Sequence, residues 1–151
     1  MMVSEAEMTK NDILTVDGVL VCGTRVLLIE RTKPPFEDKL VFPGGHVEKG
    51  ESCEQAVVRE LHEEVGMAVA AQDLQFLIEL SGSGRDPRPG HRVARVYWMP
   101  VEETVLDLAV AGSDARALHL VDLNSIEPSH MGFDHYRAVQ ALKEVLNESD
   151  S

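Results

Sequence analysis

Apolar residues recur along the chain in short blocks that have the length of β-strands. The clearest blocks cover residues 12–23 and 25–32, and they meet at Gly23-Thr24, a junction typical of a β-hairpin. Further strands are predicted at 40–43, 73–81, 92–101, 103–110 and 117–123. The pattern therefore predicts a sheet built from several short strands.

Two segments have helical rather than strand periodicity. The first runs from Ser52 to Val65, where Ser52 and Gln55 form a capping box and Gly66 supplies the stop. The second lies near the end of the chain, within residues 133–147. Its apolar positions make a helical stripe: Ala138, Val139, Leu142, Val145 and Leu146. Strands around two helices predict a mixed α/β fold.

The length and composition suit one soluble domain. Its 151 residues are enough to bury a core, so residues 12–148 are expected to form a single domain behind a flexible arm, residues 1–11. No apolar run is long enough for a membrane span, and the arm has no signal-peptide character. Cys22 and Cys53 alone make no disulfide framework, which favours the cytoplasm.

Charge narrows the range of partners. The formal net charge is −12, from 26 acids and 14 bases, so nucleic acid and other polyanions are not expected as partners. Six of the acids fall between Glu48 and Glu64. A dense acidic cluster either faces solvent or binds a cation, and the spacing of its members has to decide between the two.

The spacing places three of these glutamates on one face of the first predicted helix, in its second half. Glu60, Glu63 and Glu64 lie within about 100° of one another, since each helical residue turns by about 100°. Carboxylates crowded in this way repel one another, and a hard cation such as Mg²⁺ would remove that penalty. The cluster therefore predicts a magnesium site.

The loop before this helix fits the same site. Gly44, Gly45 and Gly50 permit a close approach of the backbone, so the Gly44 carbonyl is expected to face the same ion. Arg59 lies within reach of several acids and is expected to pair with Glu51, which would hold the loop against the helix.

These positions together resemble a known family motif. The stretch from Gly45 to Met67 fills every constrained position of G-x5-E-x7-R-E-U-x-E-E-x-G-U, the Nudix box, where U is a bulky apolar residue. The resemblance implies an α/β/α sandwich with a mixed central sheet, and metal-dependent hydrolysis of a diphosphate linkage with Mg²⁺ or Mn²⁺. It implies metal ligation by four residues, Glu60, Glu64, Glu63 and the Gly44 carbonyl. It gives Glu51 and Arg59 the role of bracing the loop.

Three further patches resemble ADP-ribose pyrophosphatase-like Nudix proteins. They are R-D-P-R with a nearby histidine, A-G-S-D-A at 111–115, and F-D-H at 133–135. The resemblance implies hydrolysis of ADP-ribose to AMP and ribose 5-phosphate. It implies that the substrate is bound by Arg85, Asp86, Arg88 and His91. Pro89 and Gly90 separate Arg88 from His91, where a single residue is expected, and a displaced loop would favour a larger nucleotide sugar.

Several choices remain open. Asp114 is the preferred general base because it lies in the second patch, while Glu63, Glu102 and Glu103 are alternatives. Nucleoside triphosphates and nucleotide sugars are alternative substrates. A ligand-sensing module for ADP-ribose-like metabolites is the alternative of another class. Related enzymes often dimerise, which makes a homodimer possible.

Overall fold

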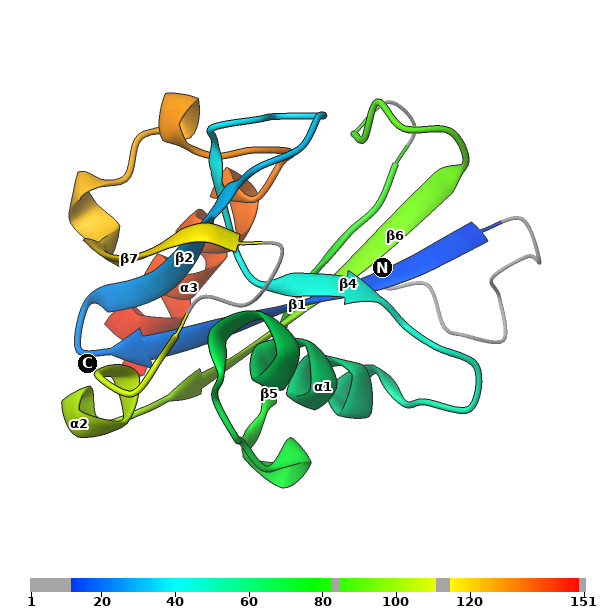
Figure 1. The fold of residues 1–151 in the computed structure, drawn as a ribbon. Helices are drawn as coiled ribbons and strands as arrows, with labels where there is room; N and C mark the ends of the chain where they lie inside the picture. Colours follow the sequence, from blue (N-terminus) through cyan, green and yellow to red (C-terminus); the bar gives the residue numbers. More distant parts are fainter. Residues whose placement is uncertain (1–11, 83–84, 111–114, 150–151) are drawn as a thin grey trace.

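A seven-stranded mixed sheet forms the centre of the part of the chain that the structure describes, residues 12–82, 85–110 and 115–149 (Figure 1). The structure is a computed structural model. Its strands are β1 (Asp12–Cys22), β2 (Arg25–Arg31), β3 (Leu40–Val41), β4 (Gly44–His46), β5 (Gln75–Leu80), β6 (His91–Pro100) and β7 (Ala115–Asp122). The helices are α1 (Cys53–Val65), α2 (Glu103–Leu106) and α3 (Tyr136–Ser149). The predicted arm, residues 1–11, lies outside the described residues.

Strand β1 organises the sheet, whose order is β3-β2-β1-β6-β5, with β4 added to β1 and β7 to β2. Its partner β6 runs parallel to it, from Asp12 opposite His91 to Val21 opposite Pro100. The other strand pairs are antiparallel, including the predicted β1–β2 hairpin, where Cys22 faces Arg25. The predicted mixed sheet is therefore confirmed.

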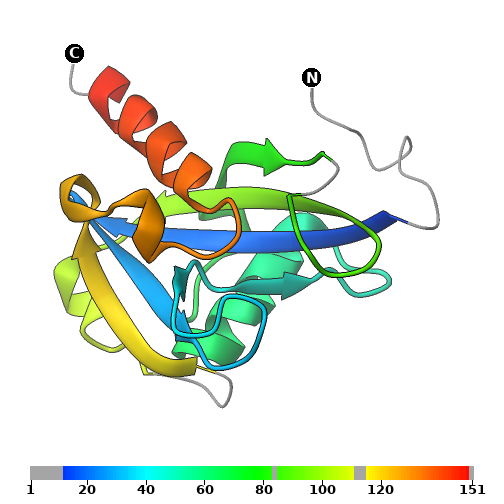
Figure 2. The same ribbon diagram turned by 90° about the horizontal axis from the view of Figure 1, so that it is seen from above.

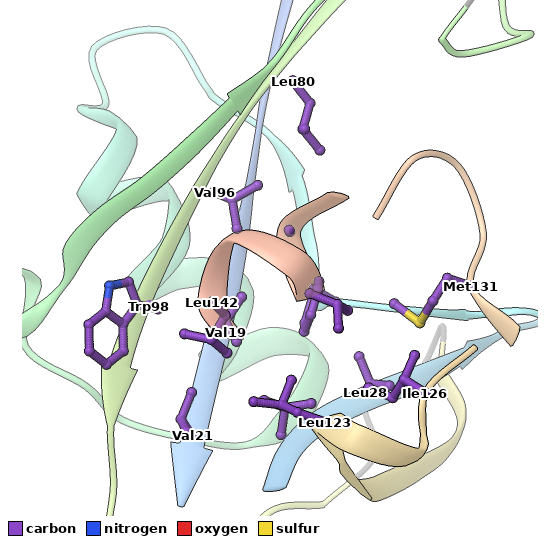
Figure 3. Close-up of a cluster of buried hydrophobic side chains, with 14 of the residues drawn as sticks. Val19, Val21, Leu28, Leu80, Val96, Trp98, Leu123, Ile126, Met131 and Leu142 are labelled. Carbon is purple, nitrogen blue, oxygen red and sulfur yellow. The ribbon is translucent and has the colours of Figure 1, made fainter. Parts of the chain in front are cut away.

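Alternating residues of the strands feed two separate cores, one on each face of the sheet. From β1, Val19 and Val21 pack with α3, whereas Val16 and Leu20 pack with α1. Figure 2 shows α3 and α1 on opposite sides of the sheet, and Figure 3 shows the cluster that joins α3 to the strands. The predicted α/β/α sandwich is confirmed.

Helix α1 follows the predicted design closely. The Ser52 hydroxyl accepts from the Gln55 amide at 3.1 Å, and the Gln55 side chain accepts from the Ser52 amide at 2.8 Å. Gly66 ends the helix in the left-handed conformation, with φ of 69°. The helix lies close to β1, because a β-carbon on Gly18 would stand only 2.9 Å from Val57 Cγ1. The carboxylates of α1 are thus held at a fixed distance from the sheet.

One predicted strand is wrong. Residues 103–110 do not join the sheet; their first turn forms α2, where the Glu102 carbonyl accepts from Val105 and Leu106. Leu106 is buried but Leu108 and Val110 are exposed, so the alternation of apolar residues does not mark a buried strand face. Strand β4, in turn, was not predicted, because a glycine-rich segment of three residues carries no strand pattern.

The described helices include none that is both long enough and apolar enough to cross a membrane. Cys22 and Cys53 form no disulfide with one another. Cys53, the first residue of α1, is buried in the core, and its sulfur accepts a hydrogen bond from Arg95 at 3.9 Å.

Candidate functional site

A cleft opens where two strands separate along the same edge of β1. Strand β4 pairs with β1 at Thr15–Asp17, whereas β2 pairs with it at Val21–Cys22. A cavity of about 240 Å³, called here the inner cavity, lies beside this fork. Its polar lining includes Asp17, Arg31, Glu64, Arg85, Arg88 and His135.

The inner cavity continues into a second, acidic hollow over α1. Gly44, Gly45, His46 and Glu64 line both spaces, so the two hollows share one wall. The acidic hollow adds the side chains of Glu48, Arg59, Glu60, His62 and Glu63. The two hollows therefore adjoin, and together they form a cleft with an acidic end and an end lined by guanidinium groups.

Glycines let the backbone of β4 lie directly against the carboxylates of α1. The Gly44 amide donates to Glu64 Oε2 at 3.1 Å. A β-carbon on Gly45 would stand 2.5 Å from Glu60 Oε1, so only glycine leaves room for that carboxylate. Glu60 is buried, while Glu63 lies at the rim with 55% of its side chain exposed.

Crowding among the carboxylates of α1 changes the protonation of Glu64. Burial, followed by the neighbouring Glu60 carboxylate, raises the pKa of Glu64 to about 9. At neutral pH Glu64 therefore retains its proton, and a divalent cation is the natural replacement for that proton. The residues fit such a cation, since Mg²⁺ takes one or two carboxylates and keeps waters for a phosphate ligand. The described residues hold no preformed cage of three or more acidic, His or Cys side chains.

Arg59 ties the loop to the helix through every nitrogen of its guanidinium. Nε and Nη2 donate to the two Glu51 oxygens at 2.8 and 3.1 Å, and Nη2 also donates to the His46 carbonyl at 2.9 Å. Nη1 donates to Glu60 at 2.8 Å and to Glu63 at 3.3 Å. The predicted Arg59–Glu51 pair is confirmed as a contact, and it fixes Glu60 as well as the loop.

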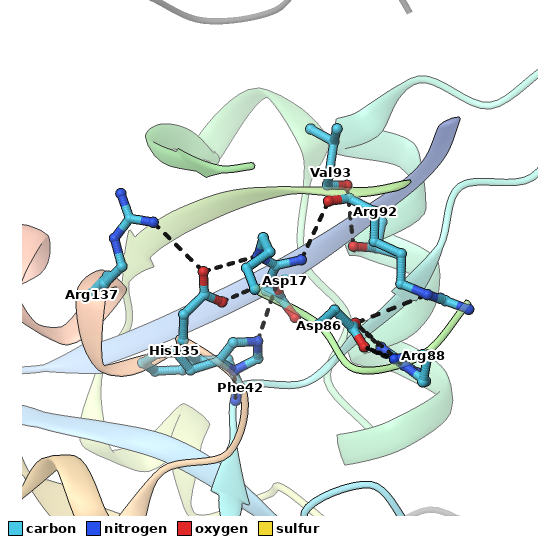
Figure 4. Close-up of polar contacts among 11 residues, drawn as sticks. Asp17, Phe42, Asp86, Arg88, Arg92, Val93, His135 and Arg137 are labelled. Atoms are coloured by element: carbon cyan, nitrogen blue, oxygen red, sulfur yellow. Dashed lines mark hydrogen bonds and ion pairs between the residues drawn. The ribbon is translucent and has the colours of Figure 1, made fainter. Parts of the chain in front are cut away.

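The other wall of the cleft comes from the 85–88 loop and the segment before α3 (Figure 4). Arg85 donates two hydrogen bonds to Asp134, from Nε at 2.9 Å and from Nη2 at 2.6 Å. Arg88 pairs in the same way with Asp86, through Nη2 at 2.7 Å and Nε at 3.0 Å. The loop is therefore an ordered wall, held by two charged forks.

Phe133 lies between two cationic groups. The guanidinium carbons of Arg31 and Arg88 lie 4.9 and 4.7 Å from the centre of its ring. Phe36 contacts the same ring, with centroids 4.8 Å apart. Arg31 Nε donates to the Pro35 carbonyl at 2.7 Å, and within the described residues it has no carboxylate at ion-pair distance. Arg31 therefore brings net positive charge to the inner cavity.

Asp17 and His135 meet at the floor of the inner cavity. The Phe42 amide donates to His135 Nδ1 at 3.2 Å, so the ring proton is on Nε2, which lies 3.6 Å from Asp17 Oδ2 (Figure 4). Burial, and then the positive charges of Arg85 and Arg31, lower the pKa of His135 to about 4. Burial raises the pKa of Asp17 to about 7, an effect that Arg85 partly offsets.

Most of the predicted site residues come together in the cleft. Gly44, Glu60, Glu63, Glu64 and Arg59 line its acidic end, with Glu51 behind Arg59. Arg85, Asp86 and Arg88 line the inner cavity.

Two predicted residues are not placed there. His91 lines neither hollow; its Nδ1 lies 2.7 Å from Asp12 Oδ1, where β6 begins beside β1. Asp114, the preferred base, lies outside the described residues.

Sequence reasoning missed three residues of the cavity. Arg31 lies at the end of a predicted strand and has no motif around it. Phe133 belongs to the F-D-H motif, in which only the polar residues were considered as site residues. Asp17 carried the clearest signal, since it is an acid in the middle of an apolar strand, and a charge at such a position is rarely buried without a reason.

Comparison with known proteins gives a consistent result. A family model described as "NUDIX domain" matches residues 13–142. An ADP-ribose pyrophosphatase from Methanocaldococcus jannaschii is 37% identical over 127 residues, which cover 84% of this chain and 70% of that protein.

Solved structures share the fold. The NUDIX domain of NrtR from Shewanella oneidensis, solved with ADP ribose, has a TM-score of 0.78 at 26% identity, covering 91% of this chain and 90% of that one. A bifunctional NMN adenylyltransferase/ADP ribose pyrophosphatase from Francisella tularensis, solved with AMP and a Mn ion, has a TM-score of 0.74 at 25% identity. That match covers 90% of this chain and only 42% of the bifunctional one.

Proposed function

The chain belongs to the NUDIX domain family, and from that premise we propose that it hydrolyses the diphosphate linkage of ADP-ribose to AMP and ribose 5-phosphate. The observation that carries the proposal is the shared wall of Gly44, Gly45, His46 and Glu64 between the two hollows. A diphosphate lying along this wall would face carboxylates able to hold a cation on one side. On the other side it would face the arginines of the inner cavity.

Nudix enzymes use divalent metal ions, and this chain offers a suitable ligand set. In the proposal Glu60 and Glu64 are the main ligands, with Glu63 and the Gly44 carbonyl as further ones. Mg²⁺ is the expected ion and Mn²⁺ the alternative. When bound, the ion would neutralise the diphosphate and acidify the attacking water.

The chain's own residues would position these groups. Arg59 and Glu51 keep the loop, and with it Gly44, at a fixed place over α1, through the hydrogen bonds from Arg59 to Glu51 and to the His46 carbonyl. Glu63 is exposed at the rim, where an attacking water has access, and it stays a candidate for the general base beside Asp114.

ADP-ribose is favoured over other diphosphates by the chain's likeness to a known ADP-ribose pyrophosphatase and to an ADP-ribose-bound NUDIX domain. The extra residue before His91 does not argue against it. Gly90, with φ of 93°, turns so close to β1 that a β-carbon would stand 2.8 Å from Ile13 Cδ1. Gly90 thus lies against β1, and Arg88 lines the cavity.

Binding of ADP-ribose without hydrolysis is a second candidate, favoured by the likeness to the ADP-ribose-bound domain of NrtR. The carboxyl groups of Glu60 and Glu64 support hydrolysis instead, because together they suit a divalent cation of the kind that Nudix enzymes use.

The test is a substrate panel run with Mg²⁺ and again with chelator. It would compare kcat/KM for ADP-ribose, nucleotide sugars, ATP, dGTP and an oxidised guanine triphosphate. We expect ADP-ribose to be the best substrate, with AMP and ribose 5-phosphate as products and no turnover in chelator. A triphosphate or nucleotide sugar with higher kcat/KM would overturn the substrate assignment. Tight ADP-ribose binding with no product would favour the second candidate.

A further inference from the structure

Asp17 carries a largely buried carboxylate that has no hydrogen bond within the part of the chain that the structure describes. Only 10% of its side chain is exposed, and that part faces the inner cavity. Within residues 12–82, 85–110 and 115–149, the nearest side-chain donor is the neutral His135 ring, whose Nε2 lies 3.6 Å from Asp17 Oδ2, beyond hydrogen-bond length. A buried carboxylate left unsatisfied is costly, so its presence calls for a partner that is not part of the described protein.

The neighbouring donors are already committed. Arg85 donates both arms of its fork to Asp134, and Arg88 donates to Asp86. His135 is held in place by the Phe42 amide, so its Nε2 stays at the observed distance from Asp17. The remaining open direction for Asp17 is the cavity itself.

The surroundings of Asp17 restrict what that partner is. Asp17 lies beside the acidic end of the cleft, because a β-carbon on Gly44 would stand 2.4 Å from its Oδ1. A phosphate group would be repelled, so the partner has to be a hydrogen-bond donor without negative charge. A nucleobase is disfavoured, since the Phe133 ring, the aromatic platform in this wall, is already contacted by Arg31 and Arg88.

We propose that Asp17 accepts a hydrogen bond from a ribose hydroxyl of the substrate and so selects ribose in the inner cavity. The proposal rests on the proposed function, in which the diphosphate lies along Gly44 and Glu64. A ribose attached to that diphosphate would enter the inner cavity next to it. The hydroxyl would satisfy the buried carboxylate, and a substrate without it would leave Asp17 unpaired.

The experiment is a double-mutant cycle in which variants of the enzyme are combined with analogues of the substrate. Wild type, Asp17→Asn and Asp17→Ala would each be assayed on ADP-ribose and on two analogues, one deoxygenated on the adenosine ribose and one on the terminal ribose. In wild type, loss of the contacted hydroxyl should lower kcat/KM by about 10- to 100-fold, the value of a charge-assisted hydrogen bond. In Asp17→Ala the same loss should cost less than about 3-fold, with Asp17→Asn in between. The analogue that shows coupling identifies which ribose enters the cavity.

Two readouts separate this role from others. Thermal unfolding of Asp17→Asn should show an unchanged or raised Tm, because no hydrogen bond within the protein is lost. A fall in Tm with an equal loss on all three substrates would overturn the proposal in favour of a structural role. Loss of Mn²⁺ binding by Asp17→Asn would overturn it in favour of a metal ligand.

The proposed function can fail separately. If wild type does not hydrolyse ADP-ribose, the same cycle is measured as Kd by calorimetry, which needs no turnover. Equal Kd ratios for wild type and Asp17→Ala on every analogue would then overturn the role of Asp17.

Discussion

The guanidinium of Arg85 donates two hydrogen bonds, 2.9 and 2.6 Å long, to the carboxylate of Asp134. Both side chains are largely buried, with 9% of Arg85 and 16% of Asp134 exposed. The bond joins two motifs that lie 49 residues apart in the sequence. The R-D-P-R loop and the F-D-H segment are therefore one wall of the cleft, and the Arg85–Asp134 pair holds the two together.

Removal of this pair should lower the stability of the protein more than its affinity for the substrate. Arg85→Ala leaves Asp134 with Arg137 alone, at 3.6 Å, and breaking a buried pair from one side should lower the free energy of unfolding by about 3 kcal/mol. The expected fall in Tm is about 6–12 °C for a chain of this size. Thermal or urea unfolding measures it directly.

Asp134→Ala is the matched variant, and the double variant completes a cycle. The two single losses should not add, because both remove the same contact. An Arg85→Ala protein of normal stability with a raised KM for ADP-ribose would instead support the direct substrate contact that the sequence suggested.

Glu64 should release a proton when metal binds. Its pKa, raised to about 9, leaves it largely protonated at pH 7, and a cation requires the carboxylate. Calorimetric titration with Mg²⁺ or Mn²⁺ in buffers of different ionisation enthalpy should therefore show about one proton released at pH 7. Metal affinity should rise as the pH approaches 9.

In the metal-free protein, the stability of the fold should fall as the pH rises. A carboxyl whose folded pKa lies above the ordinary 4.5 loses its stabilising contribution as the pH rises from there toward 9. Unfolding of wild type in chelator should show this decline, and Glu64→Gln should flatten it. Metal binding by wild type without proton release would show that the pair is already ionised.

The function of Arg59 should depend on the forked shape of its guanidinium more than on its positive charge. Arg59→Lys keeps the charge but loses the fork that reaches Glu51, the His46 carbonyl and Glu60 together. We expect kcat to fall by about 10- to 100-fold with little change in KM, since the loop would be misplaced over the metal ligands. Steady-state kinetics measures the split. Arg25→Ala, which removes the exposed ion pair with Glu103, is the control and should be silent.

The acidic half of the site was predictable because it is local in sequence. Glu60 and Glu64 lie on α1, where helical periodicity brings them to one face, and Glu51 lies on the loop just before the helix, within reach of Arg59. The capping box and the glycine stop fixed where that helix begins and ends.

The inner cavity was harder to predict because its residues meet only through the sheet. Asp17, Arg31 and His135 come from distant segments, and the fork between β2 and β4 depends on a glycine strand with no pattern of its own. The 103–110 error has a similar origin, since apolar alternation says nothing about whether an adjacent strand is present.

Gly44 and Gly45 should respond differently to the same added methyl group. On Gly44, a β-carbon would stand 2.1 Å from the Val16 carbonyl oxygen, an atom of the backbone that cannot yield without distorting the β1–β4 pair. Gly44→Ala should therefore lower stability. On Gly45, the obstacle is the end of the Glu60 side chain, at 2.5 Å, which is able to rotate away.

Gly45→Ala should thus give a folded protein with a misplaced carboxylate. We expect a Tm close to that of wild type, weakened Mn²⁺ binding by calorimetry, and kcat lowered by about 100-fold or more, because the displaced group is one of the two main proposed ligands. Gly50→Ala is the control, since a β-carbon there meets no atom within 4 Å and the cost comes only from its φ of 85°. Gly45→Ala with normal metal binding and turnover would show that Glu60 does not need this glycine, and would remove the main structural support for its role as a ligand.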